Sequence, residues 1–271
     1  MANYIFLVSI FILGILSVRP ERILFYEQNP GCNITDNDYC NNTHIVHIQS
    51  DADNMNQSTY HNLWIFSNGY KPAIILFETE PTARLVIDWS KFFQHKNNDS
   101  IHFQNGIVRN SFGFELSDLF IVNMTSKQQL LYNIPIHQLN WSVNFTERHD
   151  NRSSIEATFF NNNNNPKIGN FRFHLKSSGR SGREKMLPKL IYSEAGNLLR
   201  FEIEQLFIPE SLQQNSTQLQ ICANLTTILD GHRMNSHIEK YTSMDDEYTP
   251  GVFHVSLFVQ KNSFLIKFPS P

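Results

Sequence analysis

Charged residues make up only 17% of this 271-residue chain, and neither sign dominates. The 22 Lys and Arg residues against 25 Asp and Glu residues leave a formal net charge of −3. A chain so close to neutrality has no bulk electrostatic attraction for nucleic acid or for an anionic membrane surface. We therefore expect no nucleic-acid partner.

The motifs of common catalytic and metal sites are also missing. The chain has no glycine-rich phosphate loop, and the segment 177–182 lacks the Gly-X-Ser-X-Gly pattern of a nucleophile elbow. The 11 histidines are scattered, and we expect them to be lone surface residues on strands. Neither His44/His47 nor His232/His237 has the helical context of a metal site. We predict no metal and no cofactor.

No apolar run reaches the ~20 residues that a membrane helix requires. The run at residues 4–18 is interrupted by Ser9, Gly14 and Ser17, and its length suits the apolar region of a signal peptide. Small residues make cleavage near Ser17 or Val18 plausible, and the alternative is an uncleaved anchor. We predict a signal peptide over 1–18 and a luminal domain over 19–271.

Only three cysteines are present. Cys32 and Cys40 are close in sequence, and in an oxidising lumen they would most simply close a small disulfide loop. Cys222 is then left over: it stays free, pairs outside this chain, or has its partner in sequence that this chain lacks. Strand alternation predicts that Cys222 lies on the outer face of its strand.

Asparagine, in contrast, is abundant, and much of it lies in glycosylation motifs. Although an Asn-rich chain generates such triplets by chance, their spread behind a signal peptide predicts a coat of N-glycans. The ten Asn-X-Ser/Thr acceptors are Asn33, Asn41, Asn56, Asn98, Asn123, Asn140, Asn144, Asn151, Asn215 and Asn224.

Alternation of apolar and polar residues with a period of two dominates the chain, and no long segment has a clean helical period. This pattern predicts an all-β fold, an antiparallel β-sandwich-like luminal domain made of one or two β units. The Gly/Ser/Arg-rich segment 177–188 is a candidate hinge between two such units, or an ordinary solvated loop. The predicted strands are 45–49, 63–67, 73–78, 84–89, 101–108, 119–124, 140–146, 155–160, 171–175, 199–203, 219–225 and 253–259.

The glycan acceptors test this pattern, because a glycan cannot occupy a packed face. On the strand 140–146, alternation places Asn140 and Asn144 on one face, with Trp141, Val143 and Phe145 on the other. The acceptors should therefore point outward while the apolar side chains point into the core.

The acidic run Asp245, Asp246, Glu247 and Tyr248 is the best candidate for a functional motif. Paired carboxylates can serve a glycosidase, but that chemistry needs two carboxyl groups facing each other across the substrate. Adjacent residues point in different directions, so we expect a structural turn or a partner contact and no catalytic residue.

Three short motifs carry a resemblance to a known family. The segment 243–253 (SMDDEYTPGVF) resembles the "DDEY-P-VF" stretch of the glycosylated lysosomal membrane protein family. The segment 86–90 (VIDWS) is similar to that family's "V-W-S" strand end, and 139–142 (LNWS) to its glycosylated "W-N" strand. Their order and approximate spacing also fit, from about residue 45 to 253.

The resemblance implies a lysosomal membrane protein with a large glycosylated luminal region, one C-terminal membrane helix and a short cytosolic tail. It implies a non-catalytic role as accessory subunit of a lysosomal major-facilitator-superfamily transporter, which it shields from proteolysis. We expect membrane attachment only through such a helix, which does not occur before Pro271. A lysosomal hydrolase using residues 245–248, or a secreted binding module, remains the alternative.

Overall fold

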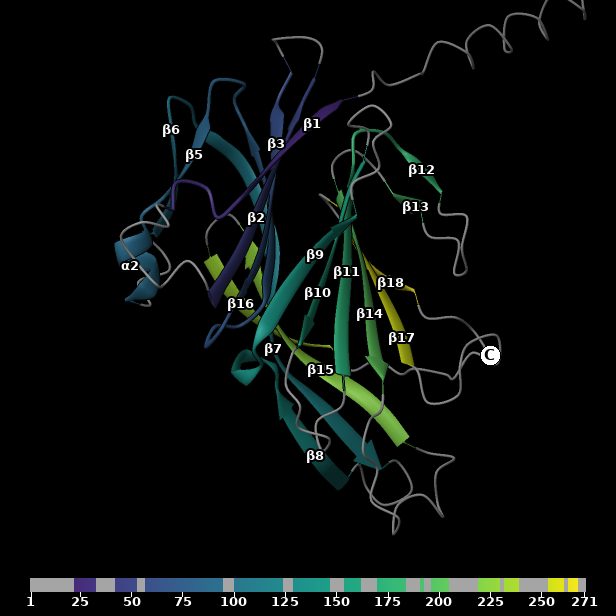
Figure 1. Ribbon diagram of the computed structural model, residues 1–271. Helices are drawn as coiled ribbons and strands as arrows, with labels where there is room; N and C mark the ends of the chain where they lie inside the picture. Colours follow the sequence, from purple (N-terminus) through teal and green to yellow (C-terminus); the bar gives the residue numbers. More distant parts are fainter. Residues whose placement is uncertain are drawn as a thin grey trace, which may run out of the picture.

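Two antiparallel β-sheets form most of the computed structural model (Figure 1). The structure describes residues 22–32, 42–52, 57–94, 100–123, 129–146, 154–161, 170–183, 191–192, 196–204, 219–229, 232–238, 253–260 and 263–267. The predicted signal peptide and the motif 245–248 lie outside these ranges. Among the described residues, no helix is long and apolar enough to cross a membrane.

The first sheet has eight strands in the order β1-β2-β3-β4-β7-β15-β16, with β8 paired to β7. Its long central strand β7 carries irregularities in register where it meets β4, β8 and β15. The strands are β1 (Ile23–Gln28), β2 (Thr43–Asp51), β3 (Thr59–Ser67), β4 (Ala73–Thr79), β7 (Val108–Asn123), β8 (Gln129–Pro135), β15 (Leu219–Leu229) and β16 (His232–Ile238).

The second sheet has six strands in the order β18-β17-β14-β11-β10-β9. Two short pairs, β5 with β6 and β12 with β13, stand apart from the large sheets. The six strands are β9 (Trp141–Thr146), β10 (Ser154–Asn161), β11 (Asn170–Ser178), β14 (Gly196–Glu204), β17 (Phe253–Gln260) and β18 (Ser263–Lys267). The remaining elements are β5 (Arg84–Ile87), α2 (Trp89–Phe93), β6 (Ile101–Gln104), η2 (Ile136–Gln138), β12 (Gly182–Arg183) and β13 (Ile191–Tyr192).

The two large sheets pack face to face around one main core. Phe66 of β3 stacks on Phe159 of β10, with ring centroids 4.0 Å apart, and lies edge-on to Trp141 of β9. All three side chains are 3% exposed or less. Every pairing between described strands is antiparallel, so the predicted all-β, antiparallel sandwich is confirmed.

Strands β2 to β4 are buried on both faces, unlike β10 and β11. In β3, Trp64 and Phe66 point into the main core, whereas Leu63 and Ile65 point to the opposite face. That opposite face is covered by α2 and the β5–β6 pair, which form a second apolar cluster around Phe92 (Figure 1). Continuous apolar runs in β3 and β4 follow from this double burial.

Two predicted strand boundaries are wrong. The strand predicted at 84–89 ends at Ile87, because Asp88 caps a short helix by accepting a hydrogen bond from the Lys91 backbone N–H at 3.1 Å. The segment predicted as one strand at 101–108 is divided into β6 and the start of β7. Asn105, with φ of +60°, lies in the turn between them.

Candidate functional site

The predicted site residues are described only in part. Asn140 and Asn144 belong to the described residues, and Asn123 and Asn224 lie in β7 and β15. Cys32 is half-buried and disulfide-bonded, but Cys40 is not described, so the Cys32–Cys40 pairing stays a prediction. Cys222 lies in β15 opposite Phe120, and the face that its side chain occupies also stays a prediction. Outside the described residues lie Asn33, Asn41, Asn56, Asn98, Asn151, Asn215, Asp245, Asp246, Glu247 and Tyr248.

The side chains of Asn140, which directly precedes β9, and of Asn144 within β9 point outward as predicted. Asn140 and Asn144 are exposed, whereas Trp141 is only 3% exposed. Val143 and Phe145 are half-buried and pack against the main core. Both asparagine side chains therefore lie on the outer side of the six-stranded sheet, where an attached glycan has room.

The first residue of β9 is tied to the other sheet. Asn68 accepts a hydrogen bond from the Trp141 backbone N–H at 2.9 Å. His44 Nε2 lies 3.0 Å from the Trp141 carbonyl oxygen, and since a carbonyl only accepts, the imidazole is the donor. Burial lowers the pKa of His44, and its hydrogen bond to Trp141 opposes that shift.

A buried pair of histidines lies on the outer face of β2 and β3. His47 Nε2 is 2.9 Å from His61 Nδ1, and His61 Nε2 is 3.1 Å from Thr79 Oγ1. His47 and His61 are 8% and 0% exposed, and the rings of His61 and Phe103 are in T-shaped contact, with centroids 4.8 Å apart. The expectation that histidines are lone surface residues is wrong for this pair, because the β5–β6 pair covers this face.

The order of protons along this chain of hydrogen bonds follows from its last acceptor. The Thr79 hydroxyl donates to the Glu80 carbonyl oxygen at 2.9 Å, so it accepts from His61 Nε2–H. His61 Nδ1 is then the acceptor, and His47 Nε2–H is the donor. The imidazole of His61 is therefore neutral in this arrangement, because its Nδ1 atom carries no proton.

Burial sets the protonation of the pair. It lowers the pKa of His47 to about 3, with His61 lowering it further and Asp51 opposing the shift. Burial also lowers the pKa of His61 to about 4. Strand alternation does place His47 beside Ile45, and His61 beside Leu63, on one face. That pattern could have indicated a shared buried face, but only with knowledge of the cover above it.

A cavity of about 250 Å³ lies where α2 and η2 approach strands β3, β4 and β7. Glu115, itself 7% exposed, is the one carboxylate among its described lining residues. The described lining of the cavity therefore contains no facing carboxylate pair of the kind that a glycosidase uses. Its lining residues are Ile65, Gly69, Tyr70, Lys71, Ala73, Ile75, Phe92, Ser100, Ile101, Glu115 and His137.

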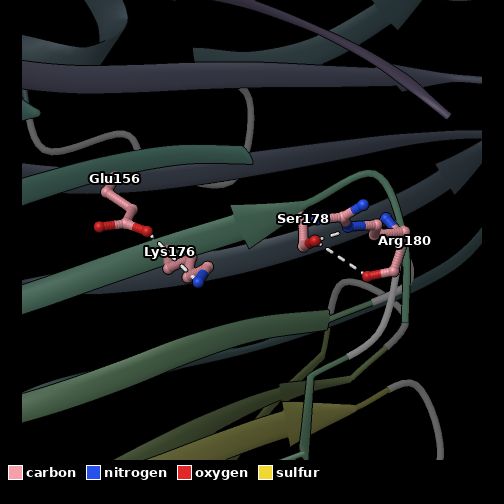
Figure 2. Close-up of polar contacts among 4 residues, drawn as sticks. All are labelled: Glu156, Lys176, Ser178 and Arg180. Atoms are coloured by element: carbon pink, nitrogen blue, oxygen red, sulfur yellow. Dashed lines mark hydrogen bonds and ion pairs between the residues drawn. The ribbon is translucent and has the colours of Figure 1, made fainter. Parts of the chain in front are cut away.

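The described part of the candidate hinge is attached to the start of β1. Figure 2 shows Ser178, whose hydroxyl donates to the Arg180 carbonyl oxygen at 2.9 Å. The Gly179 carbonyl accepts from the Arg22 backbone N–H at 2.7 Å. The buried Arg22 guanidinium in turn donates to the carbonyl oxygens of Ser50 and Ser58 at 3.0 and 2.8 Å. Residues 184–188 are not described, so the hinge itself stays a prediction.

Known proteins resemble this chain over most of its length. Residues 44–266 match the family model described as glycosylated lysosomal membrane protein. Glycosylated lysosomal membrane protein B of Xenopus laevis is 22% identical over 274 residues, and glycosylated lysosomal membrane protein A of the same species is 22% identical over 276. Each alignment covers 93% of this chain and 62% of the relative. The chain thus spans less than two thirds of these relatives.

Proposed function

Since the chain belongs to the glycosylated lysosomal membrane protein family, we propose that it is a non-catalytic luminal glycoprotein that protects a membrane transporter. In this proposal it binds a lysosomal transporter of the major facilitator superfamily and shields it from lysosomal proteases. The match over residues 44–266 carries the proposal, and the resemblance of the three sequence motifs points to the same role.

Two features of β9 and the sheets support a shielding role. A glycan is bulky and hydrated, so each occupied acceptor denies a protease close approach to the nearby backbone. Asn140 and Asn144 are exposed on the sandwich surface, where glycans can extend away from the protein. A sandwich with a continuous core is a rigid domain, and in this proposal it holds such glycans in place above the luminal loops of the partner.

The test is the survival of lysosomal transporters in cells that lack this protein. We expect the abundance of one major-facilitator transporter to fall several-fold, and inhibitors of lysosomal proteases to restore it. Re-expression of the wild-type chain, in its full natural form, should also restore it. Unchanged abundance of all such transporters, or a loss that protease inhibitors do not prevent, would contradict the proposal.

The acidic motif separates this function from hydrolysis. In the proposal, Asp245, Asp246, Glu247 and Tyr248 form a structural turn or docking surface. Replacing Asp245 and Asp246 by Asn should reduce folding yield or transporter retention, because a lost carboxylate interaction costs about 1–3 kcal/mol. A variant that folds normally and retains the transporter, but loses a measurable glycoside-hydrolase activity, would favour the enzyme instead.

A further inference from the structure

Among the described strands, β9 ends the six-stranded sheet and pairs with β10 alone. An edge strand of this kind presents unpaired N–H and C=O groups, which can pair with a strand of another molecule. Which β9 groups face the open side follows from the contacts of Trp141.

Both backbone polar groups of Trp141 point away from β10. Its N–H donates to Asn68 and its carbonyl accepts from His44, and both partners belong to the other sheet's side of the sandwich. In an antiparallel pair, successive residues alternate between facing the partner strand and facing away. Val143 and Phe145 therefore also direct their N–H and C=O groups to the open edge.

The outward-facing backbone groups of β9 have hydrogen-bond partners at Trp141, the first residue of the strand. His44 and Asn68 satisfy both groups of Trp141. Within the described part of the chain, no residue hydrogen-bonds the outward N–H or C=O groups of Val143 or Phe145.

The neighbouring surface is apolar, which increases the tendency of this edge to associate with another molecule. Strand β1 is an edge strand of the other sheet, and its Ile23, Phe25 and Tyr26 side chains are 44%, 45% and 41% exposed. Tyr26 stacks on Phe145, with ring centroids 5.4 Å apart, so the β1 and β9 edges meet on the same side of the sandwich. Exposed apolar edge strands are predicted sites of association.

The two predicted glycan acceptors lie next to these open groups: Asn140 and Asn144 are on either side of Val143, and Asn144 directly precedes Phe145. Asn140 and Asn144 lie four residues apart, or ~13 Å along an extended strand, and Val143 lies between them. We propose that glycans on Asn140 and Asn144 block the β9 edge against strand addition by a second copy of this chain. Two β9 edges can pair antiparallel around a two-fold axis, so the association that the glycans prevent is a closed dimer.

The test compares variants that differ in glycosylation at this edge. Asn140→Gln/Asn144→Gln removes both glycans through the acceptors, and Ser142→Ala/Thr146→Ala removes them through the third residue of each motif. Ser142→Thr/Thr146→Ser retains both motifs and is the matched control. Mass spectrometry establishes occupancy, and analytical ultracentrifugation of the full secreted chain measures its mass as a function of concentration.

We expect the wild type and the control to remain monomeric, and both glycan-free variants to approach a twofold mass as concentration rises. Hydrogen exchange at the Val143 and Phe145 amides should slow in the dimer. Val143→Pro, added to the Gln variant, should restore the monomer, because it removes an N–H that no described residue uses.

Three results would overturn the proposal. The first is that neither acceptor is glycosylated in the secreted protein. The second is that the glycan-free variants stay monomeric. The third is that these variants associate without a change in hydrogen exchange at the Val143 and Phe145 amides. Enzymatic removal of the glycans from folded wild type gives the same comparison if a variant fails to fold. The outcome is independent of transporter binding, since no transporter is present.

Discussion

Asn197 donates a hydrogen bond from Nδ2 to the Oδ1 atom of Asn62, 2.8 Å away, in the interior between the two sheets. Asn62 donates in turn to the Ser177 hydroxyl, and Trp64 Nε1 donates to Asn197 Oδ1, both at 3.0 Å. Asn62 and Asn197 are fully buried. The network joins β3 of one sheet to β11 and β14 of the other, so it fixes how the sheets align.

Replacing Asn62 by Leu should therefore destabilise the protein strongly. The change leaves the Asn197 amide and the Ser177 hydroxyl without this partner in the core, which costs about 1–3 kcal/mol. Urea unfolding of the variant measures the loss. The control is Asn110→Leu, the same chemical change at an exposed position on β7, where we expect less than about 0.5 kcal/mol. Equal losses in both variants would refute a specific role for the network.

Gly179 should tolerate no side chain, although its Gly/Ser/Arg-rich segment has the composition of a loop. A Cβ atom there would overlap the carbonyl oxygen of Arg22, which belongs to backbone that is itself hydrogen-bonded to Gly179. We expect Gly179→Ala to lower the free energy of unfolding by about 1–3 kcal/mol, as overpacking does.

The control for Gly179 is a glycine with open space around it. Gly69 has φ of +83°, and no atom of the described residues lies within 4 Å of the position that a Cβ atom would take, so its constraint is conformational only. Asn tolerates this region better than other residues, and Gly69→Asn should cost less than Gly179→Ala. Thermal unfolding of both variants measures the two losses of stability. A larger loss for Gly69→Asn than for Gly179→Ala would show that the backbone at Arg22 shifts easily to make room for a Cβ atom.

The alternation of apolar and polar residues predicted the strands with one buried face better than the strands that are covered on both faces. In β11, Phe171, Phe173 and Leu175 are buried, as predicted, because one face of that strand packs on the core. The same reasoning placed Asn140 and Asn144 correctly. It failed where a second layer covers the sheet, since local sequence does not reveal what packs above a strand. That cover buries His47 and His61, and Trp89 begins a helix instead of ending a strand.

The ion pair between Glu156 and Lys176 should contribute little, despite its cross-strand position. The residues are directly opposite in β10 and β11, with Lys176 Nζ 3.3 Å from Glu156 Oε1 (Figure 2). Solvent reaches both side chains, which are 29% and 16% exposed, and pairs of this kind contribute about 0.2–1 kcal/mol. Glu156→Gln should cost no more than this, and the difference should shrink in 1 M salt. A larger cost that salt does not reduce would contradict the surface-pair interpretation.

The buried pair His47 and His61 should make stability depend on pH in the acidic range. Burial lowers their pKa values to about 3 and about 4 in the folded protein, whereas an unfolded imidazole has a pKa near 6.5. Between these values the unfolded chain binds protons that the folded chain does not. Stability is therefore full above pH ~6.5 and falls as the pH decreases, by roughly 2 kcal/mol per imidazole between pH 7 and pH 5.

His47→Gln tests this dependence while keeping an N–H donor within reach of His61 Nδ1. The variant should lose about half of the pair's contribution to the decrease in stability between pH 7 and pH 5, because one of two titrating groups is gone. Unfolding in urea at several pH values measures it. At pH 7.5, where both imidazoles are mostly neutral in either state, any difference from wild type reports only the pH-independent cost of the substitution. A pH dependence unchanged by His47→Gln would mean that the imidazole of His47 does not remain neutral in the folded core.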